Sequence, residues 1–245
     1  MYVEMEQYLK LFRTSSEYSG STDKPLVSHI VDDVEVIQKV DPYLGHEYVE
    51  IGGLKWATMN IGANSVTDYG YYFQWGDTQG YTLDQVGSGA GKKLFNWSTY
   101  KFGGDDVSYG QTKYNNIDGK KVLDAEDDGA AVNWGGKWRM ATTAEFDALT
   151  AATNSTFVSN YQGSGVGGML FTDKNDSSKV LFFPATGAFT EDGHSQLLNL
   201  YGYYWTSSLA RQISRANNIT FTNSGSLWDG NTIRCLGDPI RAVAE

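Results

Sequence analysis

Apolar and polar positions alternate over short stretches of this chain and seldom recur at helical spacing. Residues 48–56 predict a hairpin that turns at Gly52 and Gly53, and residues 69–75 predict an aromatic strand. Further strands are predicted, between clusters of turn residues, at 168–172, 179–184, 202–207, 219–222 and 233–243. The pattern is typical of many short strands joined by turns rather than of a helical bundle.

Two segments carry helix signals. Residues 123–134 have acidic side chains in their first turns, where these side chains stabilise the positive end of a helix dipole. Thr142 and Glu145 form a capping box ahead of a second helix. The acidic run at 124–128 also suggests a calcium loop, but it lacks the glycine and the terminal glutamate of an EF-hand. We therefore interpret it as a helix start and predict no metal and no cofactor.

The N-terminal part of the chain differs from the rest. Residues 3–12 predict one short helix, and residues 26–40 form a β-prone run. Their apolar faces need a partner, which is either the main domain or a neighbouring subunit. We expect an arm at 1–45 that serves oligomerisation or docking, followed by a domain at 46–245. Within that domain, residues 78–120 are a long glycine-rich excursion, a kind of insertion that is usually functional or mobile.

Composition narrows the class of protein. The chain has 245 residues with 28 Gly, 16 Tyr and only 4 Pro, which favours strands and loops. A formal charge of −10 without a basic cluster argues against nucleic acid as a partner. Cys235 is the single cysteine, so neither an intramolecular disulfide nor a cysteine-based zinc site can form. Neither a signal peptide nor a membrane span is visible, so we expect cytoplasmic synthesis and no membrane insertion.

Signals for catalysis are weak. His29, His46 and His194 are scattered along the chain. The sequence contains no GxSxG elbow and no HExxH or HxH metal pair. Carboxylates are plentiful, but a pair suited to glycoside hydrolysis is not recognisable from spacing alone. We therefore expect no enzymatic activity and assign no catalytic residue.

The most informative segment is residues 201–245, where an aromatic and aliphatic framework is interrupted by polar residues. Tyrosine and tryptophan offer large contact area at low entropy cost, and serine and asparagine offer adaptable hydrogen bonds. This mixture favours a binding surface over a reaction centre. Arg139 and Arg241 are predicted to be structural, either stacking or pairing with carboxylates. The predicted core positions are Trp134, Trp138, Tyr204, Trp205, Ile240 and Val243.

The candidate ligand-binding residues are the late polar or exposed positions that lack a sustained apolar period. An ordinary solvated loop is the alternative interpretation of the same residues. The set comprises Arg211, Gln212, Ser214, Asn217, Asn218, Thr222, Asn223, Trp228, Asp229, Asn231 and Thr232.

Five motifs in order resemble a known family. They are YVEIGGLKWATMN at 48–60, YFQWGD at 72–77, WGGKWRM at 134–140, YWTSS at 204–208 and IRAV at 240–243. Over about residues 46–243 the chain resembles the domains of Bacteroidetes and their phages that are named after the Fibrobacter succinogenes major paralogous domain. The resemblance implies an α+β, C-type lectin-like fold of the formylglycine-generating enzyme type, with short twisted antiparallel strands, two helices and long loops.

A narrower resemblance is to the variable proteins of diversity-generating retroelements, a group that includes the major tropism determinant of phage tails. It implies a diversified region at about 203–243 that binds a host-surface protein or glycan. It also implies a receptor-binding or tail-tip role in the virion, with residues 1–45 joining copies or the tail assembly. One departure is Ala141, where the group's pattern leads us to expect proline. The oxidases of the related fold depend on cysteine chemistry and bound copper, and Cys235 alone lacks the thiol pair they use.

Two other interpretations remain open. The first is an adhesive or structural protein of a bacterial cell surface, without retroelement diversification, and the missing signal peptide counts against it. The second is a glycan-binding module with a fixed sugar ligand, with or without Ca²⁺. A reverse-transcriptase gene and a near-copy of the segment encoding 203–243 in the flanking DNA would distinguish diversification from both.

Overall fold

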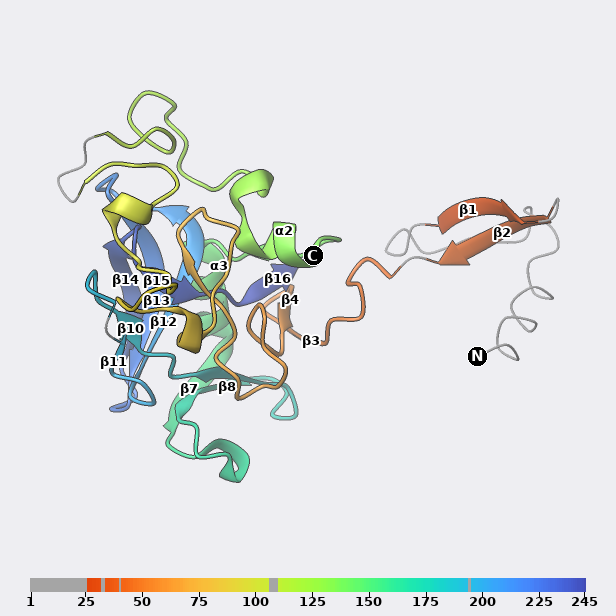
Figure 1. Cartoon of the computed structure of the whole chain (residues 1–245). Coiled ribbons are helices and arrows are strands. Elements are labelled where there is room, and N and C mark those ends of the chain that lie inside the picture. Colours follow the sequence, from red (N-terminus) through yellow and green to blue (C-terminus); the bar gives the residue numbers. More distant parts are fainter. Residues whose placement is uncertain (1–25, 32–33, 40, 106–109, 194) are drawn as a thin grey trace. The chain divides into compact units, whose positions relative to one another are not determined.

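The computed structural model describes residues 26–31, 34–39, 41–105, 110–193 and 195–245 (Figure 1). The chain divides into two compact units, Met1–His46 and Glu47–Glu245. In the first unit, β1 (Leu26–Val31) pairs with β2 (Val34–Lys39) as an antiparallel hairpin. The β-prone run at 26–40 therefore contains a hairpin, whereas the helix predicted at 3–12 lies outside the described residues.

The second unit is a mixed α+β structure of small antiparallel sheets, which confirms the predicted class at that level. The strand orders are β3-β4-β16-β6, β5-β15, β7-β8-β9, β10-β11 and β12-β13-β14. The strands are β3 (Tyr48–Ile51), β4 (Leu54–Ala57), β5 (Tyr72–Gln74), β6 (Arg139–Met140), β7 (Thr153–Val158), β8 (Gly168–Asp173), β9 (Val180–Pro184), β10 (Ala188–Phe189), β11 (Ser195–Gln196), β12 (Tyr201–Leu209), β13 (Arg215–Thr222), β14 (Leu227–Ile233), β15 (Gly237–Pro239) and β16 (Ala242–Ala244).

Helices are few in the described part of the chain. The α-helices are α2 (Gly129–Trp134) and α3 (Thr143–Ala152). Four 3-10 helices accompany them: η1 (Leu83–Gln85), η2 (Trp97–Thr99), η3 (Ala125–Asp127) and η4 (Tyr161–Gly163). No helix in these ranges is long and apolar enough to cross a membrane.

The two ends of the second unit meet in one sheet. The β3–β4 hairpin turns at Gly52 and Gly53, with φ of 63° and 83°, a left-handed conformation that glycine adopts without steric cost. β16 then pairs with β4 through Val243 and Trp56, and with β6 on its other side. The predicted hairpin is confirmed, and the C-terminal strand closes the unit against its first hairpin.

The start of α3 matches its sequence signal, whereas the start of α2 does not. The Thr142 side chain accepts from the Glu145 amide, and the Glu145 carboxylate accepts from the Thr142 amide at 2.7 Å, so the capping box is confirmed. The helix predicted at 123–134 is wrong in its first half. Asp128 leaves helical geometry with φ −85° and ψ 112°, and its carboxylate caps the amides of Ala130 and Ala131. A helix N-cap must have non-helical geometry, so η3 and α2 are separate.

The strand predicted at 233–243 is also wrong as a single element. The amide of Leu236 donates to the carbonyl of Ile233 in a turn, and the chain then enters β15 and afterwards β16. These two strands belong to different sheets, because β15 pairs with β5 and β16 pairs with β4 and β6. The sequence pattern also failed to predict β7, whose exposed positions are polar.

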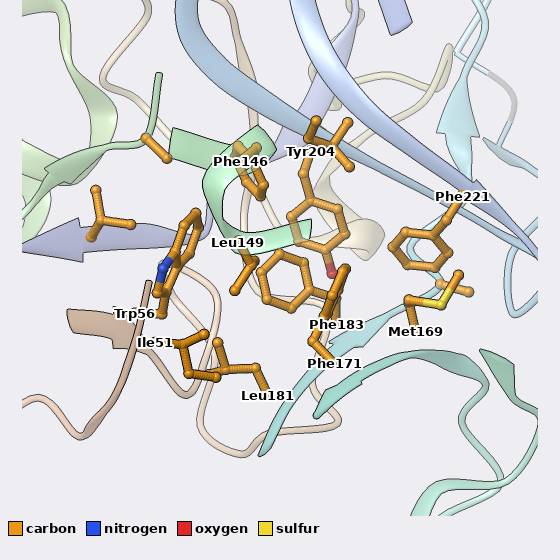
Figure 2. Close-up of a cluster of buried hydrophobic side chains, with 14 residues drawn as sticks. Ile51, Trp56, Phe146, Leu149, Met169, Phe171, Leu181, Phe183, Tyr204 and Phe221 are labelled. Atoms are coloured by element: carbon orange, nitrogen blue, oxygen red, sulfur yellow. The ribbon is translucent and has the colours of Figure 1, made fainter. Parts of the chain in front are cut away.

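The main apolar core lies between α3 and the sheets formed by β7–β9 and β12–β14. Phe146 and Leu149 of α3 project toward the rings of Phe183 and Tyr204, with Trp56 beside them (Figure 2). The ring centroids of Trp56 and Phe146 are 4.9 Å apart, and those of Phe183 and Tyr204 are also 4.9 Å apart. Burial of each such side chain contributes roughly 1.5–3 kcal/mol. The core therefore fixes α3 against β12 and β13.

The predicted structural residues divide by burial. Trp138, Tyr204, Trp205, Ile240 and Val243 are buried as predicted, whereas Trp134 is half-buried and meets Trp138 edge to face. The structural roles predicted for the two arginines are confirmed, by different contacts. The Arg139 guanidinium pairs with Glu145 through two nitrogens. Buried Arg241 stacks 4.3 Å from the ring centroid of Phe183 and donates mainly to backbone carbonyls.

Candidate functional site

The candidate site lies on the sheet formed by β12, β13 and β14, and the strand register defines its two faces. Asn217 pairs with Asn231, Ile219 with Asp229, and Phe221 with Leu227. Because Ile219 and Phe221 belong to the core beside α3, side chains at these alternating positions share what we call the α3 face. Intervening positions, including Thr220 and its partner Trp228, project from the opposite face.

The predicted ligand-binding residues divide into three groups by exposure. Six are exposed, as a ligand-facing role requires: Arg211, Gln212, Asn223, Trp228, Asp229 and Asn231. Two are half-buried, Asn217 and Thr232. The remaining three, Ser214, Asn218 and Thr222, are buried. The prediction that these three face a ligand is therefore wrong.

Hydrogen bonds explain why two of these polar residues are buried. The amide of Asn218 donates to Asp238 Oδ2 at 2.9 Å and to Thr232 Oγ1 at 3.0 Å. Its carbonyl accepts from Thr220 Oγ1 at 3.3 Å. At the far end of β13, the hydroxyls of Thr222 and Ser224 lie 2.6 Å apart across the turn. These two side chains are thus satisfied inside the protein.

Ser214 is buried for a different reason. It lies in the turn that precedes β13, and its carbonyl accepts the amide of Arg234 at 3.0 Å. Arg234 is buried as well, and its guanidinium donates to the carbonyls of Lys113 and Tyr114. The position of Ser214 is therefore fixed from within the unit.

Three of the exposed predicted residues line one open pocket. Its lining consists of Ala210, Arg211, Gln212 and Asn231, and its volume is about 420 Å³. Arg211 and Gln212 lie in the turn between β12 and β13, which is closed by hydrogen bonds between the backbones of Ala210 and Arg215 and of Arg215 and Gln212. Two separate elements, this turn and β14, therefore supply the pocket.

Arg215 links the turn to the strand. Its Nη1 donates to the carbonyl oxygen of Asn231 at 3.4 Å, so the two walls of the pocket are connected. The lining offers a guanidinium and carboxamides, which donate and accept hydrogen bonds but are neither nucleophiles nor general bases at neutral pH. The chemistry of this pocket is suited to recognition.

The α3 face continues from the pocket onto α3. The amide of Asn217 donates to Thr143 Oγ1 at 3.2 Å, and the hydroxyls of Thr143 and Thr206 lie 3.3 Å apart. One turn further along α3, Asp147 meets Asp229 of β14. Burial raises the pKa of Asp229, and the interaction with the Asp147 carboxyl raises it further.

Thr143 and Asp147 were not among the residues predicted from the sequence. They lie in α3, outside the segment whose composition indicated binding, and each looks like an ordinary exposed helix residue. Thr143 and Asp147 are four residues apart in the helix that begins after Thr142, and residues at this spacing share one face of a helix, which is the signal that could have identified them.

One acidic group has the spacing of metal ligands, but cations already occupy its surroundings. Carboxylate oxygens of Asp124, Glu126 and Asp127 lie within 4.8 Å of one another. The Lys113 ammonium is 2.8 Å from both Asp124 and Glu126 and also pairs with Asp127. Hydrogen bonds from Lys113 and Lys120 hold the pKa of Asp124 at about 2. These residues form an ion-pair network that ties the 113–127 segment together.

Comparison of the chain with protein-family models, with curated proteins and with solved structures gave no match. The structure is that of an α+β protein of small antiparallel sheets, with a polar pocket at the end of its C-terminal three-stranded sheet.

Proposed function

We propose that this chain is a ligand-recognition protein whose binding surface is the pocket formed by Arg211, Gln212 and Asn231 together with the adjoining α3 face. One observation carries the proposal: residues from a turn and from a neighbouring strand converge on an open pocket, while the polar residues between them are locked into the interior. The proposed surface is therefore a set of exposed polar side chains displayed on a buried, hydrogen-bonded base.

The rigidity of the base matters for affinity. Residues that are already fixed lose less conformational entropy on binding, so more of the contact energy appears as affinity. Asn218 and Arg234 provide this fixation from below, through hydrogen bonds to β15 and to the 113–114 backbone. Substitutions at Arg211, Gln212 or Asn231 would change the ligand contacts without disturbing these bonds.

The resemblance found in the sequence extends the proposal. We take the Glu47–Glu245 unit to be a C-type lectin-like domain and the chain to be a phage receptor-binding or tail-tip protein without enzymatic activity, whose region at about 203–243 is diversified. The N-terminal arm would then join copies of the chain or attach it to the tail. Joining several weak sites would raise avidity by roughly 10²–10⁴ without new contacts.

The flanking DNA tests diversification. We expect a reverse-transcriptase gene nearby and a near-copy of the segment encoding residues 203–243 that differs only opposite template adenines. If the copy differs at codons for the pocket residues and not at those for Asn218 or Ser214, diversification and the proposed surface agree. If no copy exists, the chain is better explained as a bacterial surface adhesin or a glycan-binding module.

A binding experiment tests recognition directly. The full chain, fluorescently labelled, would be incubated with a panel of intact Bacteroidetes strains, and binding would be read by flow cytometry. We expect binding to a subset of strains that is lost in Arg211→Ala and Asn231→Ala. The matched control is Lys174→Ala, which changes an exposed residue in the turn between β8 and β9. Equal binding by the pocket variants and the control would contradict the proposal.

A further inference from the structure

The outer edge of β14 carries backbone groups for which the described residues supply no partner. β14 pairs with β13, and no other described strand lies along its second edge. None of its residues is buried, and Trp228 is 45% exposed. An uncovered strand edge is a template on which another extended chain can pair.

The register identifies which backbone groups point outward. Backbone hydrogen bonds at the two ends of the β13–β14 ladder set the register. At one end the Arg234 amide donates to the Ser214 carbonyl, and at the other the Thr222 amide donates to the Ser226 carbonyl. Hydrogen-bonded pairs alternate along an antiparallel ladder, so Trp228, Gly230 and Thr232 direct their backbone groups toward β13. The backbone groups of the intervening residues, Leu227, Asp229, Asn231 and Ile233, point away from it.

Some of these outward groups are already engaged. The carbonyl of Asn231 accepts from Arg215, and the carbonyl of Ile233 accepts from the Leu236 amide. Among the described residues, the amides of Asp229 and Asn231 and the carbonyl of Asp229 have no such partner. They repeat every two residues along the edge, which is the spacing at which an extended chain presents its own donors and acceptors.

Charge indicates what kind of chain would fit. Asp229 and Asp147 are both exposed, and their carboxyl groups face each other beside this edge. A cation placed there would relieve their mutual repulsion, and the chain as a whole carries a formal charge of −10. A second copy of this chain is a poor occupant, because antiparallel pairing of two β14 edges would bring two such aspartate pairs together.

We propose that the edge of β14 docks an extended, cationic polypeptide segment of a partner, which adds as a fourth strand and places a lysine or arginine against Asp147 and Asp229. The proposal rests on the proposed function, since it names a protein strand as the partner class of the same sheet. Backbone hydrogen bonds would supply affinity, and the aspartate pair would supply selectivity.

The first test uses a defined probe with the full chain. The probe is the acetylated, amidated heptapeptide TVKVKVT, in which both lysines project from one side of the strand and the central valines from the other. Its matched control is TVEVEVT. We expect TVKVKVT to bind and to slow hydrogen exchange at the amides of Asp229 and Asn231. Equal binding of both peptides, or slow exchange at these amides in a dimer of the free chain, would overturn the proposal.

Methylated probes separate strand addition from simple charge attraction. N-methylation of alternate amides removes the donors along one edge of the peptide and leaves the other edge intact. One methylated set should abolish binding of TVKVKVT, and the other should leave it nearly unchanged. An equal effect of the two sets would overturn pairing along β14.

Protein variants complete the design. Asp229→Asn should weaken TVKVKVT about two- to fivefold, which is the range expected for one exposed charge pair. Lys174→Ala should leave peptide affinity unchanged, because Lys174 is an exposed residue in the turn between β8 and β9. If TVKVKVT binds as expected but cell binding survives in Arg211→Ala, only the pocket is contradicted. If cell binding depends on Arg211 but TVKVKVT does not bind, only the edge is contradicted.

Discussion

The amide nitrogen of Asn218 donates a 2.9 Å hydrogen bond to the buried carboxylate of Asp238, which joins β13 to β15. β15 in turn pairs with β5, so this bond ties the C-terminal sheet to the aromatic strand of the scaffold. This buried hydrogen bond is thus one of the polar contacts that join the C-terminal sheet to the scaffold.

Replacement of Asn218 tests its structural role. Asn218→Ala removes the donor to Asp238 and should lower the free energy of unfolding by about 1–3 kcal/mol, the cost of an unsatisfied buried polar group. Urea denaturation followed by tryptophan fluorescence measures the change. Arg211→Ala is the control, and it should stay within about 0.5 kcal/mol of the parent, as exposed positions usually do. Equal stability of the two variants would place Asn218 on the surface.

The pH dependence of stability should carry the signature of Asp238. Burial raises the pKa of this carboxyl from an ordinary 3.8 to about 7, although the hydrogen bond from Asn218 acts in the opposite direction. The folded state therefore binds a proton more tightly than the unfolded state. Its stabilising contribution is complete below pH 4 and is lost as pH rises toward 7, with a slope of at most about 1.4 kcal/mol per pH unit.

Asp238→Asn should flatten the dependence of the free energy of unfolding on pH between about 4 and 7, because the amide retains an acceptor for Asn218 and does not titrate. Denaturation at several values between pH 4.5 and 7.5 measures the slopes of the parent and the variant. Parallel profiles for the two proteins would show that Asp238 does not titrate in this window.

Substitution of Arg241 should lower the stability of the protein far more than substitution of Arg139. The buried Arg241 guanidinium satisfies the carbonyls of Ala57, Thr58 and Phe182, so Arg241→Met leaves several buried acceptors without a donor. We expect a loss of at least about 3 kcal/mol, since each bond to a charged donor contributes about 1.5–3 kcal/mol. Arg139→Met breaks a partly exposed pair and should cost less than about 1 kcal/mol. Thermal unfolding of the two variants measures these stability losses. Equal losses for Arg241→Met and Arg139→Met would contradict the prediction.

Gly230 lies where β14 has no room for a side chain. A Cβ at this position would come within 2.5 Å of Asn218 Oδ1 and 2.6 Å of Thr220 Oγ1. Gly230→Ala should therefore destabilise the protein by about 1–3 kcal/mol, as overpacking generally does. Gly89→Ala is the control, because its nearest neighbour would be 3.8 Å away. If Gly230→Ala is as stable as the control, the packing beneath β14 is looser than described.

Local signals in the sequence predicted several elements well. The Gly52–Gly53 hairpin and the Thr142–Glu145 capping box depend on residues close together in the chain, and both form as predicted. Prediction from local sequence was wrong where a side chain has a partner far away in the sequence. Asp128 appeared to be part of a continuous helix, but its carboxylate also accepts from the Met140 amide, so it caps a shorter helix instead.

Prediction of the candidate site from the sequence was limited in the same way by partners that are distant in the chain. Composition indicated that the last forty-five residues display polar chemistry, and Arg211, Gln212 and Asn231 do line one pocket. It did not distinguish Asn231 from Asn218, although the two have the same side chain. The difference is the face of the sheet: Asn231 projects into solvent, whereas Asn218 points toward Asp238.

The sequence by itself determined the many short strands, the Gly52–Gly53 turn, the Thr142–Glu145 capping box and the segment that carries the polar residues, because propensity and short-range hydrogen bonding depend on neighbouring residues. Only the tertiary structure decided which polar side chains are buried, which strands share a sheet, and that Thr143 and Asp147 of α3 adjoin the surface. Those outcomes depend on contacts between residues far apart in the chain, and such contacts leave no periodic trace in a single sequence.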